Sequence, residues 1–232
     1  AGLAISEKLK AQIKSTNQAS RNANDGISMV QTAEGGLDEV SNMLTRLREL
    51  SIQAASDTVG DSERGFTNME YQSLKQEIER ISQVTEYNGT KLLNGKEQKL
   101  DFQIGVNNVD FEDRVKYNTE KLNSTLDSLA IGELEVTTKE SSQTSLGSLD
   151  TAISHIAGQR AELGALQNRL NSTINNLNVT GENLSAANSR VRDADYAAIT
   201  SENTKLSILQ SAGTSVLAQS NQQAQSALKL VG

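Results

Sequence analysis

The sequence predicts a mainly α protein, an elongated antiparallel helical bundle or coiled coil with a small β-hairpin region. The 232 residues include no Pro, and an interior Pro costs a helix about 3 kcal/mol. Hydrophobic residues make up only 36%, with three Phe and four Tyr. So little apolar surface suits narrow helical stripes, whereas a sheet sandwich would need more Val, Ile and aromatic residues.

A seven-residue apolar repeat in the last third is the strongest single indication of a long helix. A repeat held this long keeps one face turned toward a partner helix, over about 145–192, or roughly 70 Å. The residues expected to pack in the core are Leu149, Ile156, Leu163, Leu170, Leu177, Leu184 and Val191. The flanks are rich in Asn, Ser, Thr and Gln rather than Glu and Lys, which indicates that these faces contact something else.

A matching stripe near the front predicts a helix over about 3–56. Its expected core residues are Val30, Leu37, Val40, Leu44 and Leu47, at seven-residue steps in two rows. The sequence Asn24-Asp25-Gly26 alone would predict a turn. A second helix is expected over about 62–86, where apolar residues recur at 3-4-3 spacing from Tyr71 to Ile81.

The middle of the chain changes period and predicts a β-hairpin region over about 96–140. Leu100, Phe102 and Ile104 alternate with polar residues, as in a half-buried strand, and the stretch 111–117 could return as its partner. A short helix over 122–129 and a strand over 133–137 are also expected. Because two strands alone are marginal in water, the hairpin must lean on the helices.

The last forty residues are expected to form a separate helical segment, residues 193–232, beside a core domain of residues 1–192. Its apolar stripe has no obvious partner in the chain. The stripe consists of Ile199, Leu206, Leu209, Val216, Leu217, Leu228 and Val231.

Composition argues against an enzyme and against several classes of partner. The chain has no Cys and one His, so we expect no catalytic residue, no cofactor and no metal site. His155 is expected to be solvated or at an interface, and Glu77 and Glu79 to be solubilising. A net charge of −7 argues against binding of nucleic acid. The sequence has no apolar run long enough to predict membrane insertion and no pattern that predicts a cleaved signal segment.

One position on the front stripe has two interpretations. Leu50 lies at the margin of the core stripe and shares a helix face with Arg46, four residues earlier. It could be a core residue, or a Leu in a partner-facing patch flanked by Arg, which is the usual chemistry of an interface anchor.

Several long blocks, in order in both halves, closely resemble bacterial flagellin. They cover roughly the first 95 and the last 90 residues. The blocks are Asn17-Gln-Ala-Ser-Arg-Asn-Ala-Asn-Asp-Gly-Ile-Ser28, Leu44-Thr-Arg-Leu-Arg-Glu-Leu50, Tyr87-Asn-Gly-Thr-Lys-Leu-Leu93, Leu163-Gly-Ala-Leu-Gln-Asn-Arg-Leu170 and Ala212-Gly-Thr-Ser-Val-Leu-Ala-Gln219.

The resemblance implies a rod-like domain of two N-side helices, a β-hairpin region and one long C-side helix. It implies that the chain runs helical through Asn24-Asp25-Gly26, and that 193–232 is the C-terminal half of an inner terminal domain. We expect the N-terminal half of that domain to be missing before Ala1, and no large outer domain between about 96 and 140.

The resemblance also implies function. A flagellin is a secreted structural subunit, exported by the flagellar type III apparatus, that self-assembles into the filament of the bacterial flagellum for motility. The implied partners are other subunits, an export chaperone at the C-terminal segment and the vertebrate Toll-like flagellin receptor, whose contacts would fall on Arg46, Leu50 and Glu70. The alternatives are a hook–filament junction protein and a soluble coiled-coil binding or signalling module.

Overall fold

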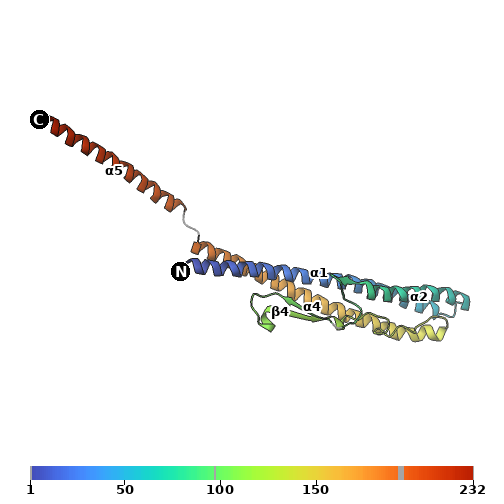
Figure 1. Cartoon of the computed structure of the whole chain (residues 1–232). Coiled ribbons are helices and arrows are strands. Elements are labelled where there is room, and N and C mark those ends of the chain that lie inside the picture. Colours follow the sequence, from blue (N-terminus) through green and yellow to red (C-terminus); the bar gives the residue numbers. More distant parts are fainter. Residues whose placement is uncertain (1, 97, 193–195, 232) are drawn as a thin grey trace. The chain divides into compact units, whose positions relative to one another are not determined.

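The computed structural model describes residues 2–96, 98–192 and 196–231, and their secondary structure is mainly helical, as predicted. It divides into two compact units, Lys10–Leu184 on the one hand and Ala1–Leu9 with Ser185–Gly232 on the other. The elements in chain order (Figure 1) are α1 (Gly2–Ala54), α2 (Asp61–Val84), β1 (Glu86–Tyr87), β2 (Thr90–Lys91), β3 (Lys99–Gln103), α3 (Asp110–Asp113), β4 (Arg114–Asn118), the 3-10 helix η1 (Thr119–Lys121), α4 (Lys139–Arg192) and α5 (Tyr196–Val231).

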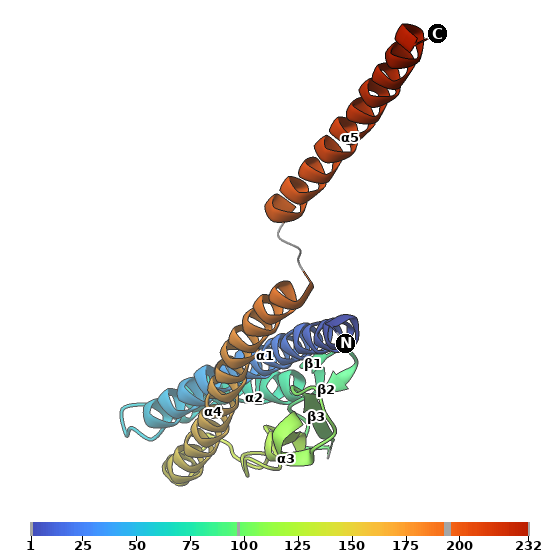
Figure 2. The ribbon, with the colours of Figure 1, turned by 90° about the vertical axis from the view of Figure 1, so that its left-hand side faces the viewer.

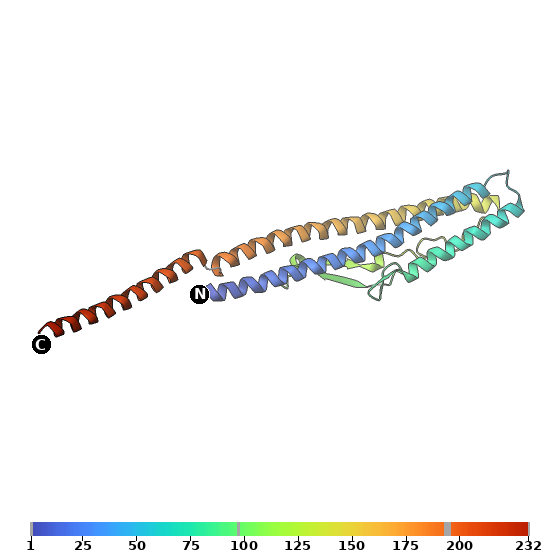
Figure 3. The same cartoon turned by 90° about the horizontal axis from the view of Figure 1, so that it is seen from above.

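Within the Lys10–Leu184 unit, α1 and α4 run antiparallel and side by side (Figures 1 and 3). Two ion pairs, the first exposed and the second half-buried, mark the register: Arg48 Nε lies 2.6 Å from Asp150 Oδ1, and the Arg160 guanidinium lies 2.7 Å from Glu34 Oε1. Positions that rise along α1 therefore meet positions that fall along α4. This is the arrangement that two long heptad stripes predict.

The two apolar stripes form the core between these helices. Burying one such Leu or Ile side chain contributes about 1.5–3 kcal/mol. The expected packing residues that are buried are Val30, Leu37, Val40, Leu44, Leu47, Leu149, Ile156, Leu163, Leu170 and Leu177.

The stripe on α4 stops packing before the helix ends, which corrects the expectation for two residues. Leu184 is only partly buried, and Val191 is 43% exposed. On α1, Gly2 lies beside Val191: a Cβ there would be 3.8 Å from Val191 Cγ1, but glycine has no side chain to cover it. The seven-residue repeat of α4 thus continues in the sequence beyond the last residue that α1 buries.

Helix α1 passes without a break through Asn24-Asp25-Gly26. Gly26 is buried, and a Cβ there would lie 3.2 Å from Phe102 Cδ1 and 3.3 Å from Leu170 Cδ1. Close packing, and not a turn, therefore favours glycine at this position. Tertiary packing outweighs the weak helix propensity of this segment.

A side chain from α2 caps the C-terminal end of α1 by bonding the carbonyl of its last residue, Ala54, and one just beyond it. Arg64 is buried, and its Nε donates to the carbonyl of Ala54 at 2.8 Å while Nη2 donates to the carbonyl of Ser56 at 3.0 Å. Capping of this kind satisfies groups that the helix terminus leaves unpaired.

The strands form two separate antiparallel pairs beside the helices (Figure 2). The predicted hairpin is β3–β4, in which Leu100 pairs with Tyr117 and Phe102 with Val115. A second pair, β1–β2, was not predicted, because each strand is only two residues long. It closes over Asn88 and Gly89, which both have positive φ, as a two-residue hairpin turn requires.

The short helix expected over 122–129 is wrong. The segment makes a single helical turn, in which the amide of Leu129 donates to the carbonyl of Thr125 at 3.0 Å. It stops at Ala130, whose φ of 53° is left-handed. Because the chain reverses there, the amide of Ile131 returns to the carbonyl of Leu126 at 3.1 Å.

The strand expected over 133–137 is also absent, because side chains of α2 bond its backbone in place of a partner strand. Lys75 Nζ donates to the carbonyls of Gly132 and Leu134 at 2.6 and 2.7 Å, and Asn68 Oδ1 accepts the amide of Val136 at 3.1 Å. We call residues 126–136, which α2 holds in this way, the strap. Glu79, expected to be solubilising, accepts the amide of Leu126 at 3.0 Å.

Helix α4 begins at Lys139, earlier than the predicted position of about 145. Thr138 precedes it as an N-cap, and its Oγ1 accepts the amide of Ser141 at 3.1 Å.

Candidate assembly and recognition surfaces

An exposed charged cluster joins α1 to α2. Arg46 Nε donates to Glu70 Oε1 and Nη1 donates to Glu49 Oε2, both at 2.9 Å. The hydrogen bond to Glu49, then that to Glu70, raises the pKa of Arg46 above its ordinary value. Arg46 and Glu70, two of the three residues implied in receptor recognition, thus lie together on the surface, with about half of each side chain exposed.

Leu50, the third of these residues, does not lie on that surface. It is 2% exposed and packs in the apolar core with Leu47 and Ala54. Of its two interpretations, the core position is the one that the structure supports. Because both interpretations place Leu50 on the same helical face as Arg46, the sequence spacing could not separate them.

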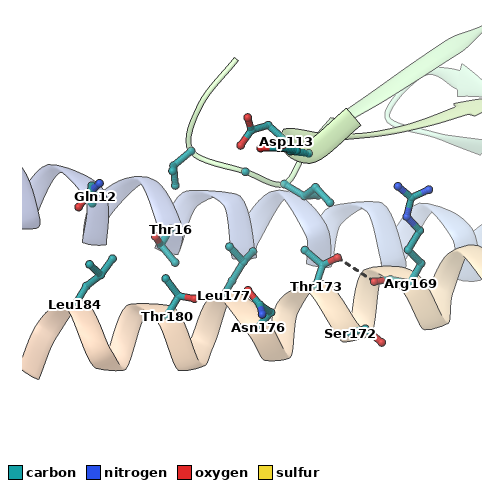
Figure 4. Close-up of a pocket in the computed structure, with 14 residues that line it drawn as sticks. Gln12, Thr16, Asp113, Arg169, Ser172, Thr173, Asn176, Leu177, Thr180 and Leu184 are labelled. Carbon is teal, nitrogen blue, oxygen red and sulfur yellow. Dashed lines mark hydrogen bonds between the residues drawn. The ribbon is translucent and has the colours of Figure 1, made fainter. Parts of the chain in front are cut away.

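A groove of about 580 Å³ lies where α1, α4 and the loop before α3 meet (Figure 4). Gln12 and Thr16 line it from α1, Leu177 and Leu184 from α4, and Ile104 from the loop. The sequence did not predict this groove, because it depends on how the loop after β3 approaches the two helices.

The chemistry of the groove is that of contact and not of catalysis. Its buried carboxylate, Asp113, accepts the amides of Asn107 and Val109 at 3.1 and 2.9 Å and so is occupied in shaping the loop. Thr173, another lining residue, donates to the carbonyl of Arg169 at 3.0 Å, within its own helix. Among the described residues, no group of His, Asp or Glu is arranged to hold a metal ion.

The exposed face of α4 beside the groove is uncharged. Residues 171–181 contain no charged side chain. The exposed amides of this face are Asn171, Asn175, Asn176, Asn178 and, one turn further on, Asn183. Such a surface can hydrogen-bond to a partner without the cost of removing a charge from water.

Every described side chain of α5, over residues 199–223, is exposed. Ile199, Leu206, Leu209, Val216 and Leu217 keep between 46% and 65% of their surface in contact with water. The side chains of Leu228 and Val231, which the sequence placed on the same stripe, lie outside the described residues. An apolar helical face of this extent is typical of an interaction surface.

Two further observations concern His155 and the hydrophobicity of the helices. His155 is exposed, and its Nδ1 lies 3.5 Å from Gln159 Nε2, which belongs to an amide and is not a nucleophile. Over the described residues, no helix is both long enough and apolar enough to span a membrane.

Comparison with protein families gives matches at both ends of the chain. Residues 1–98 match the bacterial flagellin N-terminal helical region, and residues 146–231 match the bacterial flagellin C-terminal helical region. Similar relatives are the flagellins of Halalkalibacterium halodurans and Bacillus subtilis. Both are 41% identical, over 231 and 260 residues, covering 100% of this chain and 84% and 86% of the relatives.

Solved structures agree with this fold. The crystal structure of Bacillus cereus flagellin has a TM-score of 0.59 at 30% identity, covering 72% of this chain and 94% of that chain. A putative flagellar hook-associated protein from Vibrio parahaemolyticus has a TM-score of 0.64 at 15% identity, covering 80% of this chain and 95% of that chain. At that identity the second likeness concerns the fold alone.

Proposed function

The chain belongs to the bacterial flagellin family, and from this premise we propose how its surfaces serve assembly, export and recognition. Flagellins are structural proteins and not enzymes, and they form the flagellar filament, which is extracellular. The chain is accordingly a structural subunit of that filament and serves motility.

The contrast between two apolar stripes carries the proposal for assembly. The stripe between α1 and α4 is buried within one unit, whereas six large apolar side chains among the described residues of α5, Ile208 included, remain in water. Exposure of that surface is unfavourable by roughly 25 cal/mol per Å², so the segment gains stability from a partner. Helices of neighbouring subunits are that partner, and residues 193–232 belong to the terminal domain that they build.

The amide face of α4 supplies a second kind of contact between subunits. Uncharged amides such as Asn175 and Asn178 can form many modest contacts, which repeat along the filament. A heterologous interface that does not close into a ring gives an open helical filament.

Elongation of flagellar seeds by the full-length subunit tests this assignment. The double variant Leu206→Gln/Leu209→Gln should fail to extend seeds in electron micrographs, because its stripe can no longer be buried. Ser207→Gln, between the two on the same helix, is the matched control and should extend them. Growth of the double variant at the wild-type rate would refute the role of the stripe.

Before assembly, the same stripe is covered by the flagellin export chaperone, and the flagellar type III apparatus exports the subunit. Size-exclusion chromatography should show a complex with the chaperone that Leu206→Gln/Leu209→Gln weakens and Ser207→Gln preserves. Cells without the export apparatus should retain the subunit. Secretion from such cells, or an unchanged complex, would contradict this part of the proposal.

The cluster of Arg46 and Glu70 is the recognition surface for the vertebrate Toll-like flagellin receptor. Leu50 supports this surface from the core, since it lies one helical turn beyond Arg46 and is buried. The side chains of Arg46 and Glu70 remain accessible for new hydrogen bonds, because their ion pair is exposed and individually weak.

A receptor-reporter assay tests the recognition surface with a control from the same helix. Arg46→Ala and Glu70→Ala should lower the response. Arg48→Ala should not, although it also removes an exposed ion pair, with Asp150. Equal responses from all three variants would contradict the proposal, and a circular dichroism melt of each variant would identify loss of folding.

A further inference from the structure

The chain contains two Asn-Gly dipeptides close together, Asn88–Gly89 and Asn94–Gly95. In such a dipeptide the glycine nitrogen can attack the Asn side-chain carbonyl, because no Cβ on the following residue blocks its approach. The chemistry of the two dipeptides is the same. Their surroundings differ.

Asn88–Gly89 is open on every side. Both residues are exposed, and a Cβ at Gly89 would meet no atom within 4 Å. Within the described part of the chain, the Asn88 side chain forms no hydrogen bond. The turn is closed by two β1–β2 pairs, Tyr87 with Thr90 and Glu86 with Lys91, and by the exposed ion pair between Glu86 and Lys91. Two-residue strands open readily, so the backbone can reach the geometry that attack requires.

Asn94–Gly95 is held in place. Asn94 Oδ1 accepts the amide of Lys96 at 3.1 Å, and Asn94 forms a β-bridge with Asn123. The side chain of Asn123 covers Gly95 so closely that a Cβ there would collide with it. Ring closure at Asn94 therefore requires that the hydrogen bond from Lys96 break and that Asn123 move away from Gly95.

We propose that Asn88 is a site of spontaneous deamidation and isoaspartate formation, and that the fold protects Asn94 from the same reaction. The Gly89 nitrogen loses its proton and bonds to Asn88 Cγ, and the Cγ–Nδ2 bond breaks to release ammonia. The product is a cyclic succinimide. Water then adds to one of the two ring carbonyls and opens the ring, giving Asp or isoaspartate at position 88.

The two products have different consequences for the hairpin. Asp adds a negative charge next to the exposed Glu86–Lys91 ion pair but keeps the backbone intact. Isoaspartate adds a methylene group to the backbone inside a two-residue turn, so the β1–β2 pairs cannot both form. The hydrogen bond from the Leu92 amide to the Thr85 carbonyl, at 3.1 Å, is the next contact that would hold the two ends together.

Peptide mapping by mass spectrometry tests the proposal on the folded subunit and on the same subunit in concentrated urea. Both are incubated at mildly alkaline pH, and electron-transfer fragmentation separates Asp from isoaspartate. In the folded protein, Asn88 should convert at least about tenfold faster than Asn94, because Asn94 reacts only after local opening. In urea the two rates should be similar.

Two variants complete the test. Asn88→Gln should abolish conversion at position 88, because its longer side chain closes a six-membered ring far more slowly. Asn123→Ala should accelerate conversion of Asn94 by removing its cover, and should leave Asn88 unchanged. Equal rates at the two sites in the folded wild type, or a faster Asn94, would overturn the proposal. So would a folded Asn88 that stays intact while urea converts it.

Discussion

At the residue scale, the ammonium group of Lys75 forms hydrogen bonds with the strap that a neighbouring strand would otherwise form. Its side chain is almost fully buried, and its ammonium bonds two carbonyls of the strap. Burial lowers the pKa of Lys75, and the nearby Glu133 and Glu135 act against that effect. A buried ammonium is stable only where such partners surround it.

Replacing Lys75 should therefore loosen the strap. Lys75→Met retains most of the apolar stem but removes the donors, and should lower the free energy of unfolding by about 1–3 kcal/mol. Urea denaturation followed by circular dichroism measures it. Lys121→Met is the control, because the Lys121 side chain is 65% exposed and its ion pair with Glu162 is long, at 4.0 Å. The free energy of unfolding of this variant should stay within about 0.5 kcal/mol of wild type. An unchanged midpoint for Lys75→Met would contradict this role of the ammonium.

Titration of Tyr117 should lower the free energy of unfolding at high pH. Burial, and secondarily Glu162, raises the pKa of Tyr117 from 10.0 to about 12, and its hydroxyl has no hydrogen-bond partner among the described residues. The folded state then keeps a proton that the unfolded state releases. This contribution is complete below pH 10 and is lost as pH rises toward 12.

Tyr117→Phe should reduce that loss, since it removes the group that titrates. Denaturation curves on both sides of pH 10 compare the two proteins, and absorbance of tyrosinate follows the titration itself. A Tyr117→Phe protein whose stability falls with pH as steeply as wild type would show that another group controls this range.

At the element scale, two adjacent glycines in α1 should respond in opposite directions to the same substitution. Gly35 is exposed, and a Cβ there meets nothing within 4 Å, so Gly35→Ala should stabilise by about 0.5–1 kcal/mol through helix propensity. At Gly36 a Cβ would lie 2.7 Å from Leu93 Cδ1 and 2.9 Å from Thr85 Oγ1. Gly36→Ala should destabilise, because the side chains of Leu93 and Thr85, or α1 itself, must shift to make room.

Thermal unfolding of the two variants is the measurement. Because the sites are neighbours on one helix, differences in the unfolded state largely cancel. A melting temperature that rises for both would show that the contact at Gly36 yields without cost.

The helices were predictable and the connections between them were not. Heptad spacing predicted α1, α2 and α4 because a long repeat averages over many residues. The strap was mispredicted because its backbone bonds go to Lys75, Asn68 and Glu79, far away in sequence. Local pattern contains no information about such partners.

The candidate surfaces were predictable to different degrees for similar reasons. The apolar stripe of α5 was predictable from the sequence, because it lies on a single helix and follows one helical period. Leu50 was ambiguous because it lies at the edge of a stripe, where one residue of rotation decides between core and surface. The cluster of Arg46 with Glu70 joins two helices, so spacing within either helix could not predict it.

At the scale of the whole molecule, the chain uses apolar residues for two purposes. Those between α1 and α4 stabilise the subunit by itself, whereas those on α5 are exposed, and we propose that they serve contacts between subunits. A filament subunit needs both, since it must fold before it joins the lattice and must still gain free energy on joining. The central claim is that the stripe of α5 is accessible in the free subunit and covered in the filament.

Cysteine labelling tests this claim most directly, because the 232 residues contain no Cys. Leu209→Cys in the full-length subunit should react rapidly with a maleimide when free, and should be protected once the subunit has extended flagellar seeds. Glu77→Cys, on the exposed side of α2, reports whether labelling itself is impaired. Equal reactivity of Leu209→Cys in free subunits and in filaments would contradict the account.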